Sequence, residues 1–276
     1  SFSIIITMYL KNQETMWIDS NAYIGHWPFR QVRNSSCKAL IERMDANGIA
    51  ASVLTNINGI FYKDTQAGNR ETYEEINSNR KWAERLIPFA VINPVYSGWR
   101  KDLQESVKEL GMKGVRLFPK YHRYGLDLPA CTELVKMCRD LEVPVGLTLR
   151  MVDSRPSSWL DISNEWRLSD VMPIVKAVPD AKFMVLNLSG STHLEKEDLD
   201  LFKKADVFMD TSGRNVLDLR GLMDTFGEEK FGFGTHSPIL DYKTGALRIA
   251  SLREDEADAK AREDLQSGNI KRFLRI

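Results

Sequence analysis

Residues 132–149 read TELVKMCRDLEVPVGLTL, and this stretch contains the unit from which the whole chain is built. Its first part, residues 132–141, places apolar side chains three and four positions apart, which is typical of a helix with one buried face. After a short turn, residues 143–149 are mostly apolar or β-branched, as in a buried strand of a parallel sheet. We therefore expect a helix followed directly by a strand.

The same alternation recurs along the chain. We expect eight strands, at residues 17–23, 50–56, 88–93, 114–118, 143–149, 183–188, 207–211 and 231–236. Helices are expected at 37–47, 71–84, 99–110, 132–141, 168–177, 195–203 and 216–226, with a terminal pair between 242 and 274. An open, doubly wound sheet is the alternative, but no GxGxxG motif follows the first strand.

The length agrees with a closed barrel, because such a barrel typically needs about 250 residues and this chain has 276. No Gly/Ser-rich or Pro-rich linker divides the chain. The sequence thus predicts an α/β fold, a single-domain (β/α)₈ TIM barrel over residues 16–276, preceded by a disordered or docked tail at 1–15.

The composition favours small-molecule partners. The chain has 38 Lys and Arg and 38 Asp and Glu residues, so no overall field attracts nucleic acid or an anionic membrane surface. Three cysteines are too few to crosslink a chain of this length, which predicts free thiols and a cytoplasmic location. The apolar run at residues 4–10 is too short to span a bilayer. We expect no nucleic-acid or membrane partner and leave a homo-oligomer as an option.

Polar side chains stand at the ends of several expected strands. In a (β/α)₈ barrel the active site lies at the C-terminal ends of the strands, and alternate residues of each strand face inward. This rule selects a group of inward polar residues that are costly to bury without partners. They are Asp19, Asn21 and Tyr23 in the first strand, Thr148 and Arg150 in the fifth, Asn187 in the sixth, Asp210 in the seventh and His236 in the eighth.

Four segments resemble the amidohydrolase superfamily, in the branch of metal-dependent hydrolases, lactonases and decarboxylases. Residues 18–23, IDSNAY, lie where that family carries a D-x-H-x-H strand, and residues 231–238, FGFGTHSP, resemble its F-G-T-D-x-P segment. Residues 111–119 with 121–124 are similar to its fourth strand and loop, and residues 269–274 to its C-terminal helix. The resemblance implies a barrel running from about residue 16 to the end.

The resemblance also implies a metal site, but its ligands are not found in this sequence. At the family's histidine and aspartate positions the chain has Asn21, Tyr23, Thr148, Asn187 and His236. Amide, phenol and hydroxyl groups give little affinity for zinc, which prefers imidazole, thiolate or carboxylate. From the sequence we therefore expect no metal ligands and no cofactor.

His236 is the one group among these five positions that ordinarily titrates near neutral pH, which suits acid or base chemistry. We take His236 as the candidate catalytic acid or base and Asp210 as its catalytic partner, with a hydrogen-bonded structural histidine as the alternative. Arginines bind carboxylates through two parallel hydrogen bonds, which predicts an anionic substrate. The candidate substrate-binding residues are Asn21, Tyr23, Arg30, Arg116, His122, Thr148, Arg150, Arg155 and Asn187.

Two functions of different classes follow. The first is a hydrolase that acts without metal on a small carboxylate-bearing lactone, ester or amide, and by resemblance a decarboxylase is a third option. The second is a non-catalytic barrel that binds such a molecule. Residues 152–166 form a long loop with two tryptophans, which predicts either a lid over the mouth or a dimer contact.

Overall fold

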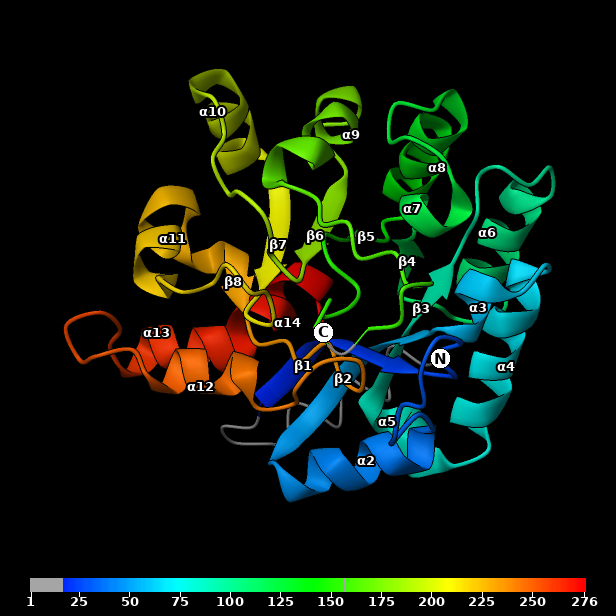
Figure 1. Cartoon of the computed structure of the whole chain (residues 1–276), viewed down its shortest axis with the longest axis horizontal. Coiled ribbons are helices and arrows are strands. Elements are labelled where there is room, and N and C mark those ends of the chain that lie inside the picture. The colour runs from blue at the N-terminus through cyan, green and yellow to red at the C-terminus, as the bar shows by residue number, and fades with distance from the viewer. Residues whose placement is uncertain (1–16, 156) are drawn as a thin grey trace.

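A computed structural model of the chain describes residues 17–155 and 157–276, so the expected tail at 1–15 lies outside the described residues. Eight parallel strands follow one another in the order of the sequence, β1 to β8 (Figure 1). They are Trp17–Ile24, Ile49–Asn56, Leu86–Val91, Gly114–Leu117, Val145–Thr148, Lys182–Leu186, Asp206–Asp210 and Phe231–Gly232. The predicted order and number of strands are confirmed.

The first and last strands meet and close the sheet. A parallel bridge joins Ala22 to Ser237, and the Ser20 amide donates to the Phe233 carbonyl at 2.9 Å. Further along, the His236 amide donates to the Asn21 carbonyl at 2.6 Å. Because β8 and the chain after it bond to β1, the open-sheet alternative is excluded and the fold is a (β/α)₈ barrel.

Helices surround the strands (Figure 1). The α-helices are α2 (Cys37–Ala46), α3 (Asn58–Phe61), α4 (Thr65–Asn77), α5 (Arg80–Arg85), α6 (Trp99–Lys108), α7 (Pro119–His122), α8 (Pro129–Asp140), α9 (Met172–Ala177), α10 (Lys196–Lys204), α11 (Leu219–Phe226), α12 (Thr244–Ala250), α13 (Ala259–Glu263) and α14 (Asn269–Leu274). Short turns at Leu168–Val171, Glu228–Lys230 and Asp264–Gly268 complete them. None of the described helices is long and apolar enough to cross a lipid bilayer.

Two expected elements differ from those observed. The helix expected at 71–84 is instead two helices, α4 and α5, because the Asn79 side chain accepts a hydrogen bond from the Lys81 amide and starts a new helix. The strand expected at 231–236 ends at Gly232. The chain beyond β8 is irregular, and His236 has a φ of +57°, a left-handed conformation that a strand does not contain.

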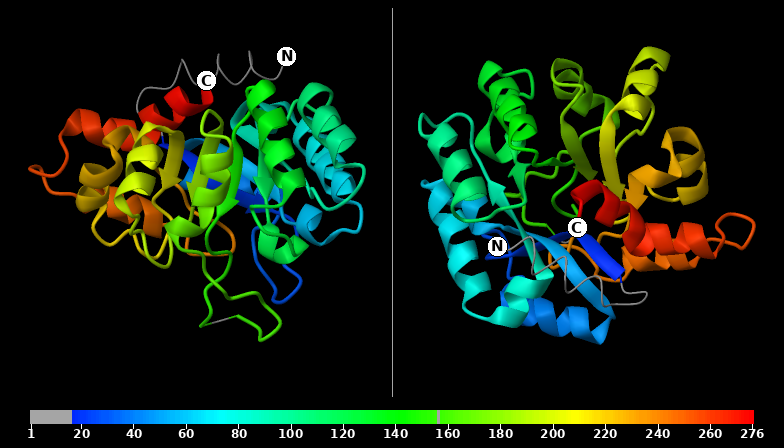
Figure 2. Two further views of the ribbon diagram at one scale, coloured as in Figure 1. Left: turned by 90° about the horizontal axis from the view of Figure 1, so that it is seen from above. Right: turned by 180° about the vertical axis from the view of Figure 1, so that it is seen from behind.

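The two ends of the barrel differ. At the N-terminal ends of the strands, Ile270 and Phe273 of α14 pack against Ile18, Ala50 and Phe208 and fill the barrel floor. Figure 2 shows the loop that follows β5 projecting from the molecule on the side away from α14. The cysteines are free and buried, and Cys131 and Cys138 belong to the apolar core around α8. Among the described residues, α14 thus closes the barrel interior at the N-terminal strand ends, and the mouth lies at the C-terminal strand ends.

Candidate functional site at the barrel mouth

The inward polar residues of the strand ends form one hydrogen-bonded network around Asn21 of β1. The Asn21 amide nitrogen donates to Asp210 Oδ2 at 2.8 Å and lies 3.1 Å from His236 Nδ1. Its side-chain oxygen, Oδ1, accepts from Arg116 Nη1 at 3.3 Å. All four residues are completely buried. Asn21 thus links a buried carboxylate, a buried guanidinium and an imidazole.

Arg116 of β4 fills the centre of this network. Its Nη2 donates to the Tyr23 hydroxyl and to Thr148 Oγ1, and its guanidinium lies 4.9 Å from the centre of the Tyr23 ring. Gly146 of β5 makes the space, since a Cβ there would lie 2.3 Å from Arg116 Cδ. The side-chain oxygens of Tyr23, Thr148 and Asn21 therefore accept hydrogen bonds from the Arg116 guanidinium. Arg116 is not available to clamp a ligand at the surface.

Asp210 at the end of β7 is held by three donors. Its Oδ1 accepts from the Asn187 amide at 2.7 Å, and its Oδ2 accepts from Ser212 Oγ at 2.6 Å in addition to Asn21. Burial raises the pKa of the Asp210 carboxyl, and these hydrogen bonds and the Arg116 charge oppose that rise. The carboxylate is fixed in place rather than directed at His236.

His236 is held at both ring nitrogens. Nδ1 faces the Asn21 amide, and Nε2 lies 2.8 Å from the Met151 carbonyl, which requires the Nε2–H tautomer. Burial lowers the pKa of His236 from 6.5 to about 3, with the Arg116 and Arg150 charges acting in the same direction. His236 is therefore neutral at physiological pH. The Met151 carbonyl and the Asn21 side chain, rather than Asp210, set its tautomer.

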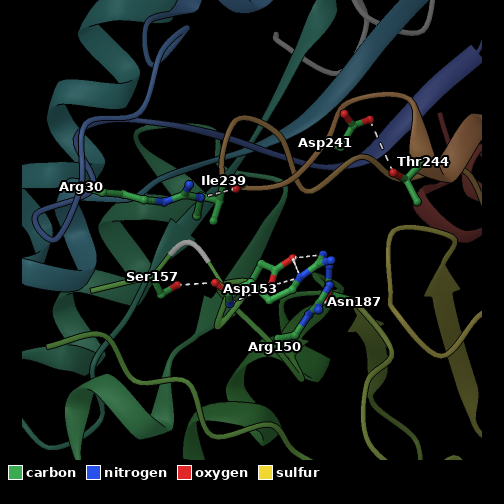
Figure 3. A network of polar contacts seen from close by, with 9 residues as sticks. Arg30, Arg150, Asp153, Ser157, Asn187, Ile239, Asp241 and Thr244 are labelled. Carbon is green, nitrogen blue, oxygen red and sulfur yellow. Dashed lines mark hydrogen bonds and ion pairs between the residues drawn. The ribbon is translucent and has the colours of Figure 1, made fainter. Parts of the chain in front are cut away.

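Arg150, directly after β5, connects this network to a pocket at the mouth. Its Nε donates to Asn187 Oδ1 at 3.0 Å, a contact drawn in Figure 3. The pocket has a volume of about 190 Å³. Its lining contains four arginines, two aspartates and three further residues: Arg150, Arg155, Arg214, Arg248, Asp153, Asp241, Ser212, Leu240 and Thr244.

The remaining predicted site residues lie apart from the network. Arg30 donates to the Ile239 carbonyl, at a distance from Arg150 in Figure 3. His122, at the end of α7, has its Nε2 3.0 Å from the Ile60 carbonyl, and burial lowers its pKa. Arg155 lies in the loop after β5, with its guanidinium paired to Asp153, and it lines the pocket.

Two pocket residues, Arg214 and Arg248, were missed from the sequence, and Ser212 was placed inward but not among the candidate site residues. Ser212 follows β7 and joins Asp210 to Asn187. Arg214 lies two residues further along, and Arg248 projects from α12. The period-two rule places Ser212 on the inward face, since it has the parity of Asp210. Nothing in the sequence places a helical arginine such as Arg248 at a strand end.

The loop at residues 152–166 is fixed over the mouth at several points. Trp27 Nε1 donates to Asp161 Oδ1 at 3.0 Å, and Glu165 accepts from Arg214 at 2.6 Å. Lys120 donates to the Asn164 carbonyl. The Trp159 side chain, in contrast, is 90% exposed. The loop covers part of the mouth and presents one tryptophan to solvent.

Solved structures of decarboxylases share this fold. The 2,6-dihydroxybenzoate decarboxylase from Rhizobium is 14% identical, with a TM-score of 0.69 over 95% of this chain and 99% of that one. The 5-carboxyvanillate decarboxylase from Sphingomonas paucimobilis is 12% identical, with a TM-score of 0.70 over 95% of this chain and all of that one. The dihydroxybenzoic acid decarboxylase from Polaromonas is 12% identical, with a TM-score of 0.69 over 95% and 97%, and contains bound manganese.

The expectation of no cofactor is therefore corrected, because manganese is bound in structures of this fold. The described residues of this chain nevertheless lack the cluster of ligands that would hold such an ion. Residues 17–155 and 157–276 contain no group of three or more His, Cys, Asp or Glu side chains able to hold a metal. Arg116 donates to the side-chain oxygens of Asn21, Tyr23 and Thr148, and its positive charge repels a cation there.

The sequence itself assigns the family. No curated protein matches the chain, but the sequence model described as amidohydrolase matches residues 42–276, which is most of the chain. The eight-stranded barrel and its similarity to decarboxylases of this fold agree with that match. The chain belongs to the amidohydrolase family.

Proposed function

We propose that this protein binds a small molecule carrying a carboxylate, and that the arginine pocket at the barrel mouth is the binding site. The observation that carries the proposal is the set of four arginines around one pocket, Arg150, Arg155, Arg214 and Arg248. Guanidinium groups match carboxylates with two parallel hydrogen bonds. The pocket also lies at the C-terminal strand ends, where barrels of this class bind their ligands.

The pocket size limits the ligand to a small molecule. Its volume of about 190 Å³ lies below the roughly 300–1,000 Å³ of pockets that bind drug-sized ligands. The Asn187 side chain donates to Ser212 and accepts a hydrogen bond from Arg150. Through Asn187, the buried network therefore positions the guanidinium of Arg150. In this proposal His236 and Asp210 are positioning residues.

A reaction at the same pocket is the second candidate. Decarboxylation is favoured by the similar solved structures, which act on aromatic carboxylates according to their names. Hydrolysis of a lactone, ester or amide would use His236 as the base. A histidine with a pKa of about 3 and both ring nitrogens bonded is a weak base near neutral pH. The geometry therefore supports binding better than hydrolysis.

Calorimetry with benzoate tests the binding proposal. We expect saturable binding to the wild-type protein, and its loss in the Arg150→Gln, Arg248→Gln double variant. Arg253→Gln is the control, because Arg253 is paired with Asp255 outside the pocket. Equal binding by the double variant would place the site elsewhere. Mass spectrometry of the protein mixed with monomethyl phthalate, an ester that carries a carboxylate, detects phthalate and methanol if water cleaves the ester. Hydrolysis that is lost in His236→Asn would establish the hydrolytic candidate instead.

A further inference from the structure

We infer that the arginine pocket selects a small dianion, a molecule with two carboxylates or one phosphate group, over a monocarboxylate. The inference rests on the proposed function and narrows its ligand class. It follows from which of the four guanidiniums already have a carboxylate partner inside the protein.

Two of the four arginines are neutralised by the protein. Arg155 forms an ion pair with Asp153, with Nη2 and Oδ2 within hydrogen-bond distance. Arg214 forms an ion pair with Glu165 at 2.6 Å. The positive charge of each of these two guanidiniums is therefore already balanced by a carboxylate of the protein.

The other two arginines have neutral partners only. Arg150 donates from Nε to the Asn187 amide oxygen at 3.0 Å. Arg248 donates from Nη1 to the Thr211 carbonyl at 2.6 Å. Within residues 17–155 and 157–276, neither forms an ion pair, and the contacts above leave both Nη groups of Arg150 and the Nη2 of Arg248 available to a ligand.

The two unpaired guanidiniums also repel each other. Burial lowers the pKa of Arg150 and of Arg248. The Glu165 charge opposes the shift at Arg150, and at Arg248 the Asp210 charge opposes it while the Arg150 charge adds to it. Arginine stays protonated in proteins despite such shifts. The protein therefore holds two positive charges on one pocket, Arg150 buried and Arg248 partly buried, and an anion between them would relieve the repulsion.

The acidic residues on the pocket wall do not cancel these charges. Asp153 is engaged by Arg155. Asp241 is exposed, and it accepts from the Lys243 amide and Thr244 Oγ1. In Figure 3 the Asp241 carboxylate lies with Thr244, away from Arg150 and Asn187. Glu165 and Asp210 act on Arg150 and Arg248 from further off, but Glu165 is paired with Arg214 and Asp210 also faces the charge of Arg116. We therefore expect a ligand with two negative charges to balance Arg150 and Arg248 better than one with a single charge.

Calorimetry with three probes tests the inference on the unmodified protein. Phthalate carries two carboxylates, benzoate carries one on the same ring, and inorganic phosphate carries its charge on a single group. We expect phthalate or phosphate to bind at least about tenfold more tightly than benzoate, since a second charge-assisted contact contributes about that much. Phthalate as the tighter dianion indicates two separate carboxylates, and phosphate indicates one dianionic group.

Variants then assign the selectivity to the two arginines. Arg150→Gln and Arg248→Gln should each reduce the preference for the dianion over benzoate, whereas Arg253→Gln should preserve it. Benzoate binding as tightly as both dianions would overturn the inference while leaving the proposed function intact. Failure of all three probes to bind would overturn the proposed function itself.

Discussion

At the scale of single residues, the site depends on a buried guanidinium that glycine makes room for. Arg116 is completely buried, and the missing side chain of Gly146 gives its methylenes space. The cost of burying its charge is reduced by the oxygens of Asn21, Tyr23 and Thr148. Asn21 also connects this cation to the buried Asp210 carboxylate. The two opposite charges stabilise each other across one amide group.

Gly146→Ala should lower the stability of the protein. The added Cβ would lie 2.3 Å from Arg116 Cδ, so Arg116 must move and its hydrogen bonds must lengthen. We expect a loss of roughly 1–3 kcal/mol in the free energy of unfolding, as is typical of overpacking. Urea denaturation measures it. Gly98→Ala is the matched control, because the nearest atom to its Cβ lies 4.0 Å away, and a loss as large in the control would contradict this account.

His236 and Asp19 should respond to acid in opposite directions. Burial lowers the pKa of His236 from 6.5 to about 3, so between these values only the unfolded chain binds the proton and stability falls as the pH falls. Burial raises the pKa of Asp19 from 3.8 to about 6. Between those values the folded protein binds the proton, and stability rises as the pH falls.

Two variants separate these contributions. Compared with the wild type, His236→Asn should lose less stability between about pH 7 and about pH 5, and Asp19→Asn should lose more. The comparison uses the change in urea midpoint between the two pH values, so that each variant's own loss at pH 7 is removed. A shift of both variants in the same direction would refute the assignment of the two pKa values.

At the scale of elements, the β5–α9 connection was the hardest part to predict. The sequence shows only that residues 152–166 form a long loop containing tryptophans. The contacts that fix it come from distant parts of the chain, as in Trp27 to Asp161 and Arg214 to Glu165. The strand ends were easier to predict, because the alternation of side chains along a strand was enough to select four residues of the network. These are Asn21, Thr148, Asn187 and Asp210, which hydrogen-bond to one another directly or through Arg116.

Trp27→Phe should loosen this loop without unfolding the barrel. The change removes the donor to Asp161 Oδ1, and a hydrogen bond to a charged group contributes about 1.5–3 kcal/mol. Chymotrypsin should therefore cleave after the exposed Trp159 about tenfold faster, while the thermal midpoint changes little. Trp82→Phe, in α5, serves as the control. Unchanged cleavage in Trp27→Phe would show that the other loop contacts are sufficient.

At the scale of the whole molecule, the barrel could be predicted because every unit repeats the same pattern of apolar residues. The closure of β8 on β1 was also accessible, since eight even units favour it over an open sheet. The residues of the pocket could be predicted from the sequence only in part. Arg150 was selected by its place after a strand, but Arg248 comes from α12, which reaches Thr211 at the end of β7 only in the folded chain. Arg116 was expected at the ligand, whereas the structure buries it.

The central claim is that a carboxylate binds between Arg150 and Arg248 at the mouth. A crystal structure of the protein grown with malonate tests it most directly. We predict that malonate lies in this pocket, within hydrogen-bond distance of both guanidiniums, while Arg155 and Arg214 keep their pairs with Asp153 and Glu165. Malonate bound elsewhere with this pocket open, or Arg150 and Arg248 turned into solvent away from each other, would contradict the account.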